Sequence, residues 1–403
     1  MSPAQALAGE LQLYPGRPLP TVWSSRPDVA PRLAAGRPAQ ALPGLLGSVF
    51  TLCANAHRLA ARLAVAAAQV PAGAASPPLI ASADEAQGLR LATARDQLAR
   101  IALDWPRLLP GESAATSAAL LQGCPLWPAT AHSGTAAALW APLGHWLRQH
   151  WLGQPPADWL QRLGDDPAGW IQRWCHSARS PLAALLQRHG AALQALSTRA
   201  VALDLLHQPT LTLPMLARQM HEPGFCRQPH WQAEQPDTGP WSRHADPLRL
   251  PAHNAWMRLT SRLVDLLRLA VDHDARWLQT GALPTGAGAG VAWVESARGL
   301  LVHSVRLAGP VPLSDKALGT EPLATMTAAT TAATTTAATV ADCRVLAPTE
   351  WNFHPRGLLA QALVPLHSAD DATRLAVAFD PCVDFEVVLP RLPALLPQEQ
   401  PHA

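Results

Sequence analysis

The chain has 403 residues, 48% of them hydrophobic, and a formal net charge of only +2 at pH 7. On the usual prior of about 100–200 residues per domain it could form two or three domains and bury a sizeable core. Basic residues are scattered along the chain, which argues against a nucleic-acid partner because phosphate binding needs clustered Lys and Arg.

No stretch approaches the roughly 20 apolar residues of a membrane-spanning helix. The N-terminal residues also lack the basic start and apolar core of a signal peptide. We therefore expect a cytoplasmic protein without membrane insertion. In that reducing compartment the six cysteines are expected to be thiols or metal ligands rather than disulfides.

The first elements expected along the chain are a strand and two helices. Residues 9–16 alternate polar and apolar side chains and end in Pro-Gly, which predicts a short strand and a turn. Pro43 to Val70 is rich in Ala and Leu and carries few charges, which predicts a helix buried on most sides. A further helix is expected over Asp84 to Leu103.

The middle of the chain, residues 106–290, is expected to be helical. Four blocks carry apolar residues at spacings of three and four, which is typical of amphipathic helices. They are Trp140–Trp151, Trp159–Trp174, Pro181–Leu205 and Ala255–Leu278. The polar, proline-containing segment Gln228–Asp246 is expected to be a surface loop.

The character of the sequence changes after Gly286. Residues 291–309 are rich in Val and Leu and predict strand, turn and strand. Residues 325–342 are almost entirely Ala and Thr, with little apolar surface to bury. We therefore expect residues 317–342 to be a mobile, low-complexity loop inserted between two strands.

Chemistry-bearing residues appear first in residues 32–57, which end with Phe50, Cys53 and His57. This segment is similar to the stretch of [NiFe]-hydrogenase large subunits that leads into their metal-binding motif Arg-Ile-Cys-Gly-Val-Cys-x-x-x-His. Cys53 matches the second cysteine of the motif and His57 matches its histidine. Phe50 stands where the first cysteine belongs, and Ser48 replaces the arginine.

The second such segment, residues 378–386, reads Ala-Phe-Asp-Pro-Cys-Val-Asp-Phe-Glu. It resembles the Asp-Pro-Cys-x-x-Cys-x-x-His signature near the C-terminus of the same family. Asp380 and Cys382 match, whereas Phe385 replaces the second cysteine and Val388 replaces the histidine.

Two further segments support the resemblance. Glu295–Gly299 is similar to the family's Glu-Ala-Pro-Arg-Gly strand, with Arg298 at the arginine, and Pro348–Arg356 is similar to its Pro-Thr-x-Trp-Asn-x-x-Pro-Arg segment. The resemblance implies a mainly α, α+β fold like that of the hydrogenase large subunit. We expect one domain over residues 1–403, with a helical bundle and a small β-rich portion built from the N-terminal and C-terminal segments.

In the family, four cysteines hold nickel and bridge it to an iron that carries cyanide and carbon monoxide, as soft thiolates can. Two thiolates cannot hold such a pair, and Phe50 and Phe385 would occupy the space of nickel and its sulfurs. The resemblance therefore implies a degenerate homologue that is not an enzyme and binds no nickel. Cys53 and Cys382 could still hold a single Fe(CN)2CO unit as metal ligands, because its diatomic ligands already fill three positions.

The resemblance also suggests supporting residues for this cofactor unit. Arg298 matches an arginine that lies close to the cyanides in the family and could donate hydrogen bonds to them. Asp380 could orient Arg298, and His57, one helical turn beyond Cys53, could hydrogen-bond its sulfur.

The pattern resembles the HupK/HoxV-type maturation accessory proteins of the family. The implied function is that of a scaffold or chaperone in assembly of the iron unit. The implied partners are the hydrogenase large-subunit precursor and small iron-carrying maturation chaperones.

Other interpretations stay open. A metal-free mimic of the large subunit that organises partners would pack Cys53 and Cys382 against apolar groups, whereas a degenerate enzyme would expose them to a sizeable pocket. Single cysteines are usually core residues, His57 could be an ordinary helix histidine, and Arg298 and Asp380 could simply form a buried ion pair. The cluster of His221, Cys226 and His230 matches no structural zinc spacing and is interpreted as non-metal.

Overall fold

The computed structural model describes residues 9–71, 77–127, 136–167, 169–246, 252–272, 274–309 and 338–389. Its α-helices are α2 (Ala30–Ala34), α3 (Leu42–Val49), α4 (Ala54–Ala68), α5 (Ala83–Ala99), α6 (Trp105–Leu108), α7 (Ala114–Leu121), α8 (Trp140–Trp146), α9 (Pro156–Asp165), α10 (Trp170–Ser177), α11 (Pro181–Ala195), α12 (Pro209–Met220), α13 (Ala255–Val271), α14 (Pro348–Asn352), α15 (Leu358–Leu363) and α16 (Ala369–Phe379). Its strands are β1 (Leu11–Leu13), β2 (Val22–Ser24), β3 (Thr280–Gly286), β4 (Ala289–Ser296), β5 (Gly299–Ala308), β6 (Thr339–Leu346) and β7 (Phe385–Val387).

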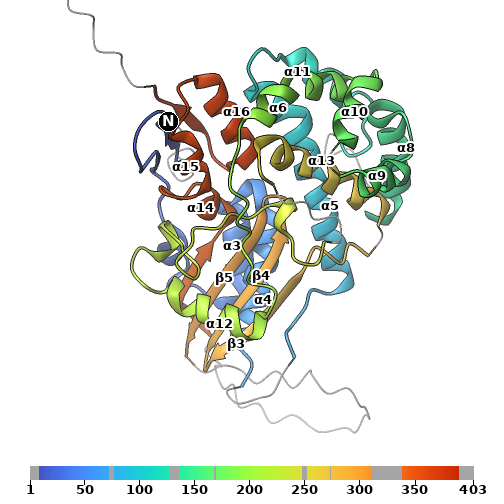
Figure 1. Cartoon of the computed structure of the whole chain (residues 1–403). Helices are drawn as coiled ribbons and strands as arrows, with labels where there is room; N and C mark the ends of the chain where they lie inside the picture. The colour runs from blue at the N-terminus through green and yellow to red at the C-terminus, as the bar shows by residue number, and fades with distance from the viewer. Residues whose placement is uncertain are drawn as a thin grey trace, which may run out of the picture.

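Helix α13 is the centre of the helical part, and α5, α8, α9, α11 and α16 pack around it (Figure 1). The side chain of Asn254 caps its N-terminus by accepting a hydrogen bond from the backbone N–H of Met257 at 2.9 Å. Leucines recur along the helix on several sides and are buried, because neighbours surround it. The helix also buries the charged residues Arg258, Arg262, Asp265 and Arg268, so it is enclosed on all sides.

The larger sheet is antiparallel, in the order β3-β4-β5-β6, and is covered on both faces. Helix α4 packs on one face and α12 on the other (Figure 1). Side chains alternate between the faces as strand geometry requires. Ala292 and Val294 belong to the core under α4, whereas Val291 and Trp293 belong to the core under α12.

A second, three-stranded sheet joins segments from opposite ends of the sequence. Strand β1 pairs antiparallel with β2 and parallel with β7, so that Leu11 lies opposite Phe385. Leu11, Leu13 and Val22 are buried against the helical core. Apolar burial on one face therefore holds the two distant segments together.

The predicted α+β, mainly helical class is confirmed, as are the short strand within residues 9–16, the helix over Asp84–Leu103 and the strand–turn–strand of residues 291–309. The β-rich portion consists of two sheets, and of these only the smaller combines N-terminal and C-terminal segments.

Three expected helices are interrupted. The predicted helix Pro43–Val70 is two helices, α3 and α4, separated by the short turn Thr51–Cys53. The block Trp159–Trp174 divides between α9 and α10, and Pro181–Leu205 is helical only to Ala195. The helical middle also ends before residue 290, because β3 begins at Thr280.

The segment Gln228–Asp246 is irregular, as expected, but it is not a surface loop. Its Asp237, Thr238 and Arg243 are buried between the larger sheet and α13. Of the predicted Ala/Thr insert, residues 317–337 lie outside the described residues, whereas Thr339 to Asp342 belong to strand β6.

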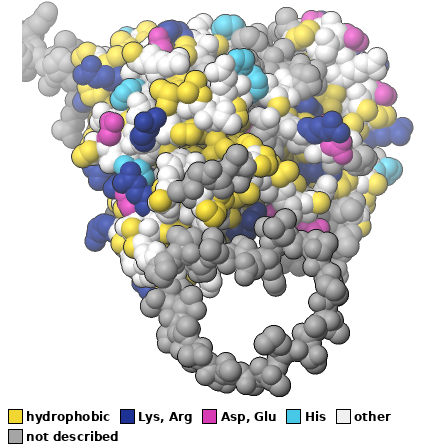
Figure 2. Space-filling model, turned by 90° about the horizontal axis from the view of Figure 1, so that it is seen from below, with side chains coloured by type: hydrophobic (Ala, Val, Ile, Leu, Met, Phe, Trp, Pro, Cys, Tyr) yellow, Lys and Arg dark blue, Asp and Glu magenta, His cyan; other side chains and the backbone are white. Residues whose placement is uncertain are grey.

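No helix among the described residues combines the length and the apolar character needed to cross a bilayer. On the face drawn in Figure 2, basic and acidic side chains are interspersed, in agreement with the net charge of +2.

Strand β4 packs directly against the backbone of α4 at Gly290. A Cβ atom there would lie 2.5 Å from the backbone oxygen of Ala64 and 2.5 Å from the backbone nitrogen of Ala68. We predict that Gly290→Ala pushes α4 away from β4 and lowers the free energy of unfolding by about 1–3 kcal/mol, as overpacking does. Urea denaturation followed by circular dichroism measures this change.

Gly44→Ala in α3 is the matched control, because a Cβ atom there meets nothing within 4 Å. It should leave the stability unchanged or raise it by up to about 1 kcal/mol. Equal stabilities for the two variants would contradict the close packing of α4 on β4.

Candidate functional site

The two cysteines singled out from the sequence line one cavity. This cavity has a volume of about 130 Å³, and its wall includes Cys53, Cys382, Arg298, His57 and Phe50. Its residues come from the α3–α4 break, the tip of the β4–β5 hairpin, the start of α14 and the segment after α16. The expected convergence of the two cysteine segments is therefore present.

Cys53 lies at the break between α3 and α4, where it precedes the first residue of α4. Helix α3 ends at Val49, and Phe50 adopts φ −99° and ψ 65°, which turns the chain out of the helical path. The sulfur of Cys53 accepts a hydrogen bond from Nη1 of Arg298 at 3.2 Å.

Arg298 occupies the two-residue tip of the β4–β5 hairpin, between the paired residues Ser296 and Gly299. Gly299 has φ +126°, and a Cβ atom there would lie 2.5 Å from Oγ1 of Thr238, so only glycine fits. Gln97 of α5 donates to the backbone oxygen of Ala297 at 2.9 Å. The tip is thus held in place beside Cys53.

Cys382 enters the cavity through an unusual backbone turn. Helix α16 ends at Phe379, and Asp380 adopts the left-handed conformation at φ 59°. The Cys382 sulfur accepts hydrogen bonds from Oγ1 of Thr349 at 2.9 Å and from Nη1 of Arg26 at 3.2 Å. Neither donor was predicted from the sequence. Arg26 belongs to no motif, and Thr349 lies in the segment Pro348–Arg356, which was matched to the family without a role for Thr349.

Asp380 is buried and is shared by three guanidinium groups. Arg100, in the π-helical turn after α5, pairs with it, Arg262 of α13 lies 2.7 Å away, and Arg298 lies 3.6 Å away. Burial alone would raise the pKa of this carboxyl, but the three cations lower it overall. The expected Asp380–Arg298 ion pair is present, although Asp380 does not line the cavity itself.

His57 does not make the predicted hydrogen bond to the Cys53 sulfur. Its Nδ1 faces Nε2 of His303 at 3.1 Å, and its ring stacks on Phe50 with 4.1 Å between centroids. Burial lowers the pKa of both histidines, that of His303 to about 3, so the pair is neutral. His57 therefore contributes an uncharged wall to the cavity.

The electrostatics of the cavity keep Cys53 protonated at neutral pH. Burial raises the pKa of its thiol to about 11, Arg298 opposes this rise, and a negative charge on Cys382 adds to it. Asp96 of α5 is near the same groups, and burial raises its pKa to about 6. A ligand that takes up a thiolate must therefore displace a proton.

Of the two phenylalanines expected to fill the cavity, only Phe50 lines it. Phe385 lies in β7 and lines a separate cavity of about 440 Å³ together with Cys382 and Arg107. Phe385 therefore does not share the wall of the smaller cavity with Phe50, because its strand pairs with β1.

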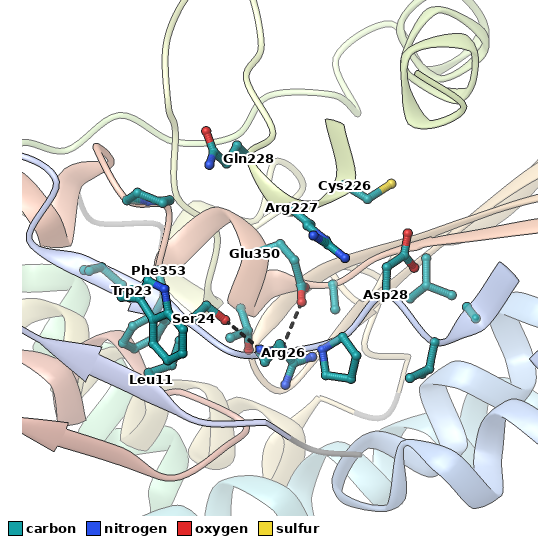
Figure 3. A pocket seen from close by; sticks show the side chains of 18 of the residues that line it. Leu11, Trp23, Ser24, Arg26, Asp28, Cys226, Arg227, Gln228, Glu350 and Phe353 are labelled. Atoms are coloured by element: carbon teal, nitrogen blue, oxygen red, sulfur yellow. Dashed lines mark hydrogen bonds and ion pairs between the residues drawn. The ribbon is translucent and has the colours of Figure 1, made fainter. Parts of the chain in front are cut away.

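A wider cavity of about 350 Å³ adjoins the first and shares Arg26, Phe50 and Thr349 with it. Figure 3 shows Arg26 pointing toward Glu350, whose Oε1 lies 3.1 Å from Nε of Arg26. Arg26 thus lies between a carboxylate in the wider cavity and the Cys382 sulfur in the smaller one.

The cluster of His221, Cys226 and His230 does not form a metal site among the described residues. His221 instead contacts Oδ2 of Asp342 at 2.9 Å and Oγ of Ser304 at 3.0 Å. Serine, histidine and aspartate follow one another as in a hydrolase triad. Ser304, however, is only 2% exposed in the middle of β5, so its hydroxyl cannot meet an external substrate.

The chain is similar to curated hydrogenase-related proteins over most of its length. It is 34% identical to the hydrogenase expression/formation protein HoxV of Cupriavidus necator, over 96% of this chain and 97% of that protein. It is 29% identical to the hydrogenase expression/formation protein HupK of Rhizobium leguminosarum bv. viciae, over 91% of each. No family model matches the chain.

Among solved structures, an NAD+-reducing [NiFe]-hydrogenase in the H2-reduced state aligns with 16% identity and a TM-score of 0.46, covering 88% of this chain and 90% of that one. The Ni-Fe-Se hydrogenase of Desulfomicrobium baculatum aligns with 12% identity and a TM-score of 0.47, covering 90% and 93%. Both TM-scores are below 0.5, so the family is shown by the relative from Cupriavidus necator, which is 34% identical over most of both chains.

The raised pKa of Cys53 predicts slow alkylation. At pH 8 its reaction with iodoacetamide should be about 100-fold slower than that of an ordinary thiol, because two pKa units reduce the thiolate fraction by that factor. In Cys382→Ser the pH profile should move to lower pH, since the neighbouring negative charge is removed. Mass spectrometry of the peptide that contains Cys53 measures both effects, and a profile that does not move would contradict the proximity of the two sulfurs.

Asp380→Asn tests the three-guanidinium cluster. Asn tolerates the left-handed backbone, but three cations then lose their shared anion, so we predict a loss of about 3–5 kcal/mol at pH 7. Because the pKa of Asp380 is lowered in the folded state, its contribution should be present above about pH 4 and decline below it.

Chemical denaturation at several pH values measures this loss. Asp384→Asn is the control, because its side chain is 75% exposed and its pair with Arg107 spans 3.9 Å. It should change the stability by no more than about 0.5 kcal/mol. A similar small change for Asp380→Asn would show that the cluster is not a structural anchor.

Proposed function

This chain belongs to the family of hydrogenase expression/formation proteins that includes HoxV and HupK, and from its role in hydrogenase maturation we propose that it is a non-catalytic scaffold for the iron unit of the cofactor. In this proposal Cys53 and Cys382 hold an Fe(CN)2CO unit transiently, as cargo. The unit is then passed to a hydrogenase large-subunit precursor.

One observation carries the proposal: both thiols face one cavity, and each accepts a hydrogen bond from its own guanidinium group. Arg298 donates to Cys53 and Arg26 donates to Cys382, each at 3.2 Å. Arg298 opposes the burial that raises the pKa of Cys53, and a cation beside each sulfur would stabilise the thiolate formed when a metal displaces the proton. The two sulfurs therefore have the surroundings of a pair of metal ligands rather than of core cysteines.

The charges in the cavity suit an anionic cargo. Arg298 shares Asp380 with Arg100 and Arg262, so three guanidinium groups meet a single carboxylate there. Cyanide ligands are hydrogen-bond acceptors with negative charge, and a planar guanidinium can donate to them in a fixed geometry. Arg298 and Arg26 are both placed for this role, because each already reaches a sulfur of the cavity.

The proton of Cys53 supports transient rather than permanent binding. Since burial raises the pKa of the free Cys53 thiol to about 11, the thiolate left by the departing cargo takes up a proton and becomes a stable, neutral thiol. This property suits a carrier that must release what it holds.

The metal-free alternative is less well supported. It expects Cys53 and Cys382 to pack against apolar groups, yet both line a cavity and receive polar contacts. A degenerate enzyme remains compatible with the cavity itself. The ring of Phe50 in its wall and the absence of further cysteines among the cavity residues weigh against nickel binding and hydrogen turnover.

We also propose the small iron-carrying maturation chaperones and the large-subunit precursor as partners. The wider cavity supports an approach from its side, because it shares Arg26 and Thr349 with the thiol cavity. Arg26, held by Glu350, would then contact both an arriving group and the Cys382 sulfur.

The test is infrared spectroscopy of protein purified anaerobically from cells that make the complete maturation machinery. Cyanide and carbonyl stretches fall where protein absorbs little. We predict these bands, and stoichiometric iron, in the wild type and their loss in Cys53→Ala and in Cys382→Ala. Cys175→Ala is the control, because Cys175 is a buried thiol of α10 in the helical core and should leave the bands intact.

A wild type without bands and without iron, which still co-purifies with the large-subunit precursor, would overturn the carrier proposal in favour of the metal-free organiser. Bands that survive both cavity substitutions would place the iron unit elsewhere on the protein.

A further inference from the structure

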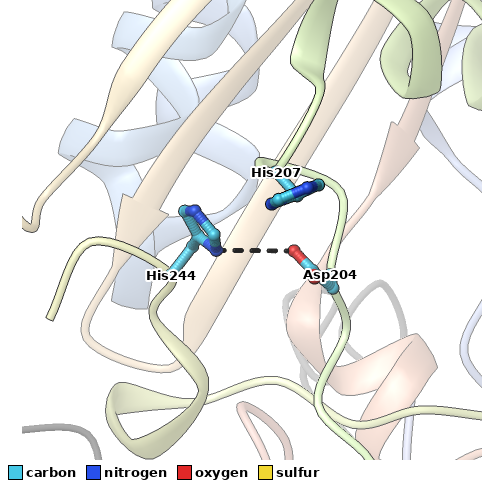
Figure 4. Close-up of side chains that lie close together, drawn as sticks. All are labelled: Asp204, His207 and His244. Atoms are coloured by element: carbon cyan, nitrogen blue, oxygen red, sulfur yellow. Dashed lines mark ion pairs between the residues drawn. The ribbon is translucent and has the colours of Figure 1, made fainter.

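We propose that Asp204, His207 and His244 form a surface binding site for a divalent transition-metal ion of the zinc and nickel class. The three side chains come from two irregular segments, one before α12 and one after the short turn Pro240–Ser242. One ligand atom of each lies within 4.8 Å of those of the other two. Figure 4 shows the three side chains gathered around a common space.

The spacing within this cluster fits a shared ion better than a direct bond. Nδ1 of His244 lies 3.6 Å from Oδ1 of Asp204, which is too long for a hydrogen bond. Two ligands that each lie about 2.0–2.1 Å from a tetrahedral ion are about 3.4 Å apart. The pair therefore has nearly the separation that two ligands of one ion require.

The two histidine rings of the cluster are in contact with each other. The rings of His207 and His244 meet edge to face, with 5.5 Å between their centroids and an interplanar angle of 75°. Within the described residues, neither imidazole has a hydrogen bond that would occupy it. All three side chains are exposed, so an ion can enter from solvent and the ligands can close on it.

Buried neighbours hold both segments in place, which lowers the cost of assembling the site. Asp204 lies between the buried Leu203 and Leu205, and the backbone N–H of Leu203 donates to the backbone oxygen of Asp237 at 2.9 Å. His244 follows the buried Arg243, which donates to the backbone oxygen of Ser296 at 2.8 Å. Only the exposed side chains need to adjust.

The ligand set selects the kind of ion. Two imidazoles and one carboxylate suit zinc, nickel, copper or iron, whereas calcium and magnesium prefer sets made of oxygen alone. Three protein ligands leave a fourth position open to water or to a ligand from a partner. A bound ion would also link the segment before α12 to the segment before α13.

The proposal is independent of the thiol cavity, and its test separates the two. Zinc is titrated by calorimetry into reduced, metal-free wild type and into His207→Ala, His244→Ala and Asp204→Asn. His145→Ala, an exposed histidine of α8 outside the cluster, is the matched control. Cobalt absorption spectra of the same proteins identify the ligands, because sulfur ligands give an intense near-ultraviolet charge-transfer band that nitrogen and oxygen ligands lack.

We expect one binding event without the sulfur band. Each cluster substitution should weaken it at least about tenfold, the lower end of what loss of even a supporting contact costs a metal site. His145→Ala should not change it. Equal affinity in all five proteins, or cobalt spectra that show sulfur ligation only, would overturn the proposal.

Discussion

The buried carboxylate of Asp380 is the constraint on which the rest of the site depends. A buried charge is tolerated only when it is paired, and here Arg100, Arg262 and Arg298 all pair with it. These cations come from the turn after α5, from α13 and from the β4–β5 hairpin. One carboxylate thus fixes four parts of the chain relative to one another. Asp380 also holds Arg298, which donates to the Cys53 sulfur. It lies two residues before Cys382, and its left-handed backbone directs the chain toward that cysteine.

The two sulfurs differ in how they are supported. Cys53 has one donor, Arg298, and that donor is held by the central cluster. Cys382 has two, and its guanidinium donor Arg26 is held by Glu350 at the edge of the wider cavity. One side of the cavity is therefore rigid and internal, whereas the other is connected to the protein surface. Such an asymmetry suits a site that must be both specific and accessible.

Much of the site could be predicted from the sequence, because short motifs keep their residues close together. Cys53, Arg298 and Cys382 do line one cavity, as their motifs suggested. The partners that come from outside any motif could not be predicted. Arg26 reaches Cys382 only through tertiary folding, and the Asp204 cluster joins segments about 40 positions apart.

Local sequence patterns also misled in two places, again for physical reasons. The spacing of His57 from Cys53 suggested a contact along one helix face, but Cys53 precedes the helix and Arg298 takes its sulfur. Gln228–Asp246 looked exposed because it is polar, yet its charges are buried in pairs such as Arg258 with Asp237.

The parallel pairing of β1 with β7 has a last consequence, for synthesis of the protein. At roughly 5–20 residues per second, the ribosome needs on the order of 15 to 65 s to travel from Cys53 to Cys382. For that time the first half of the cavity exists without the second, so under our proposal both thiols could hold the iron unit only after this segment has been translated.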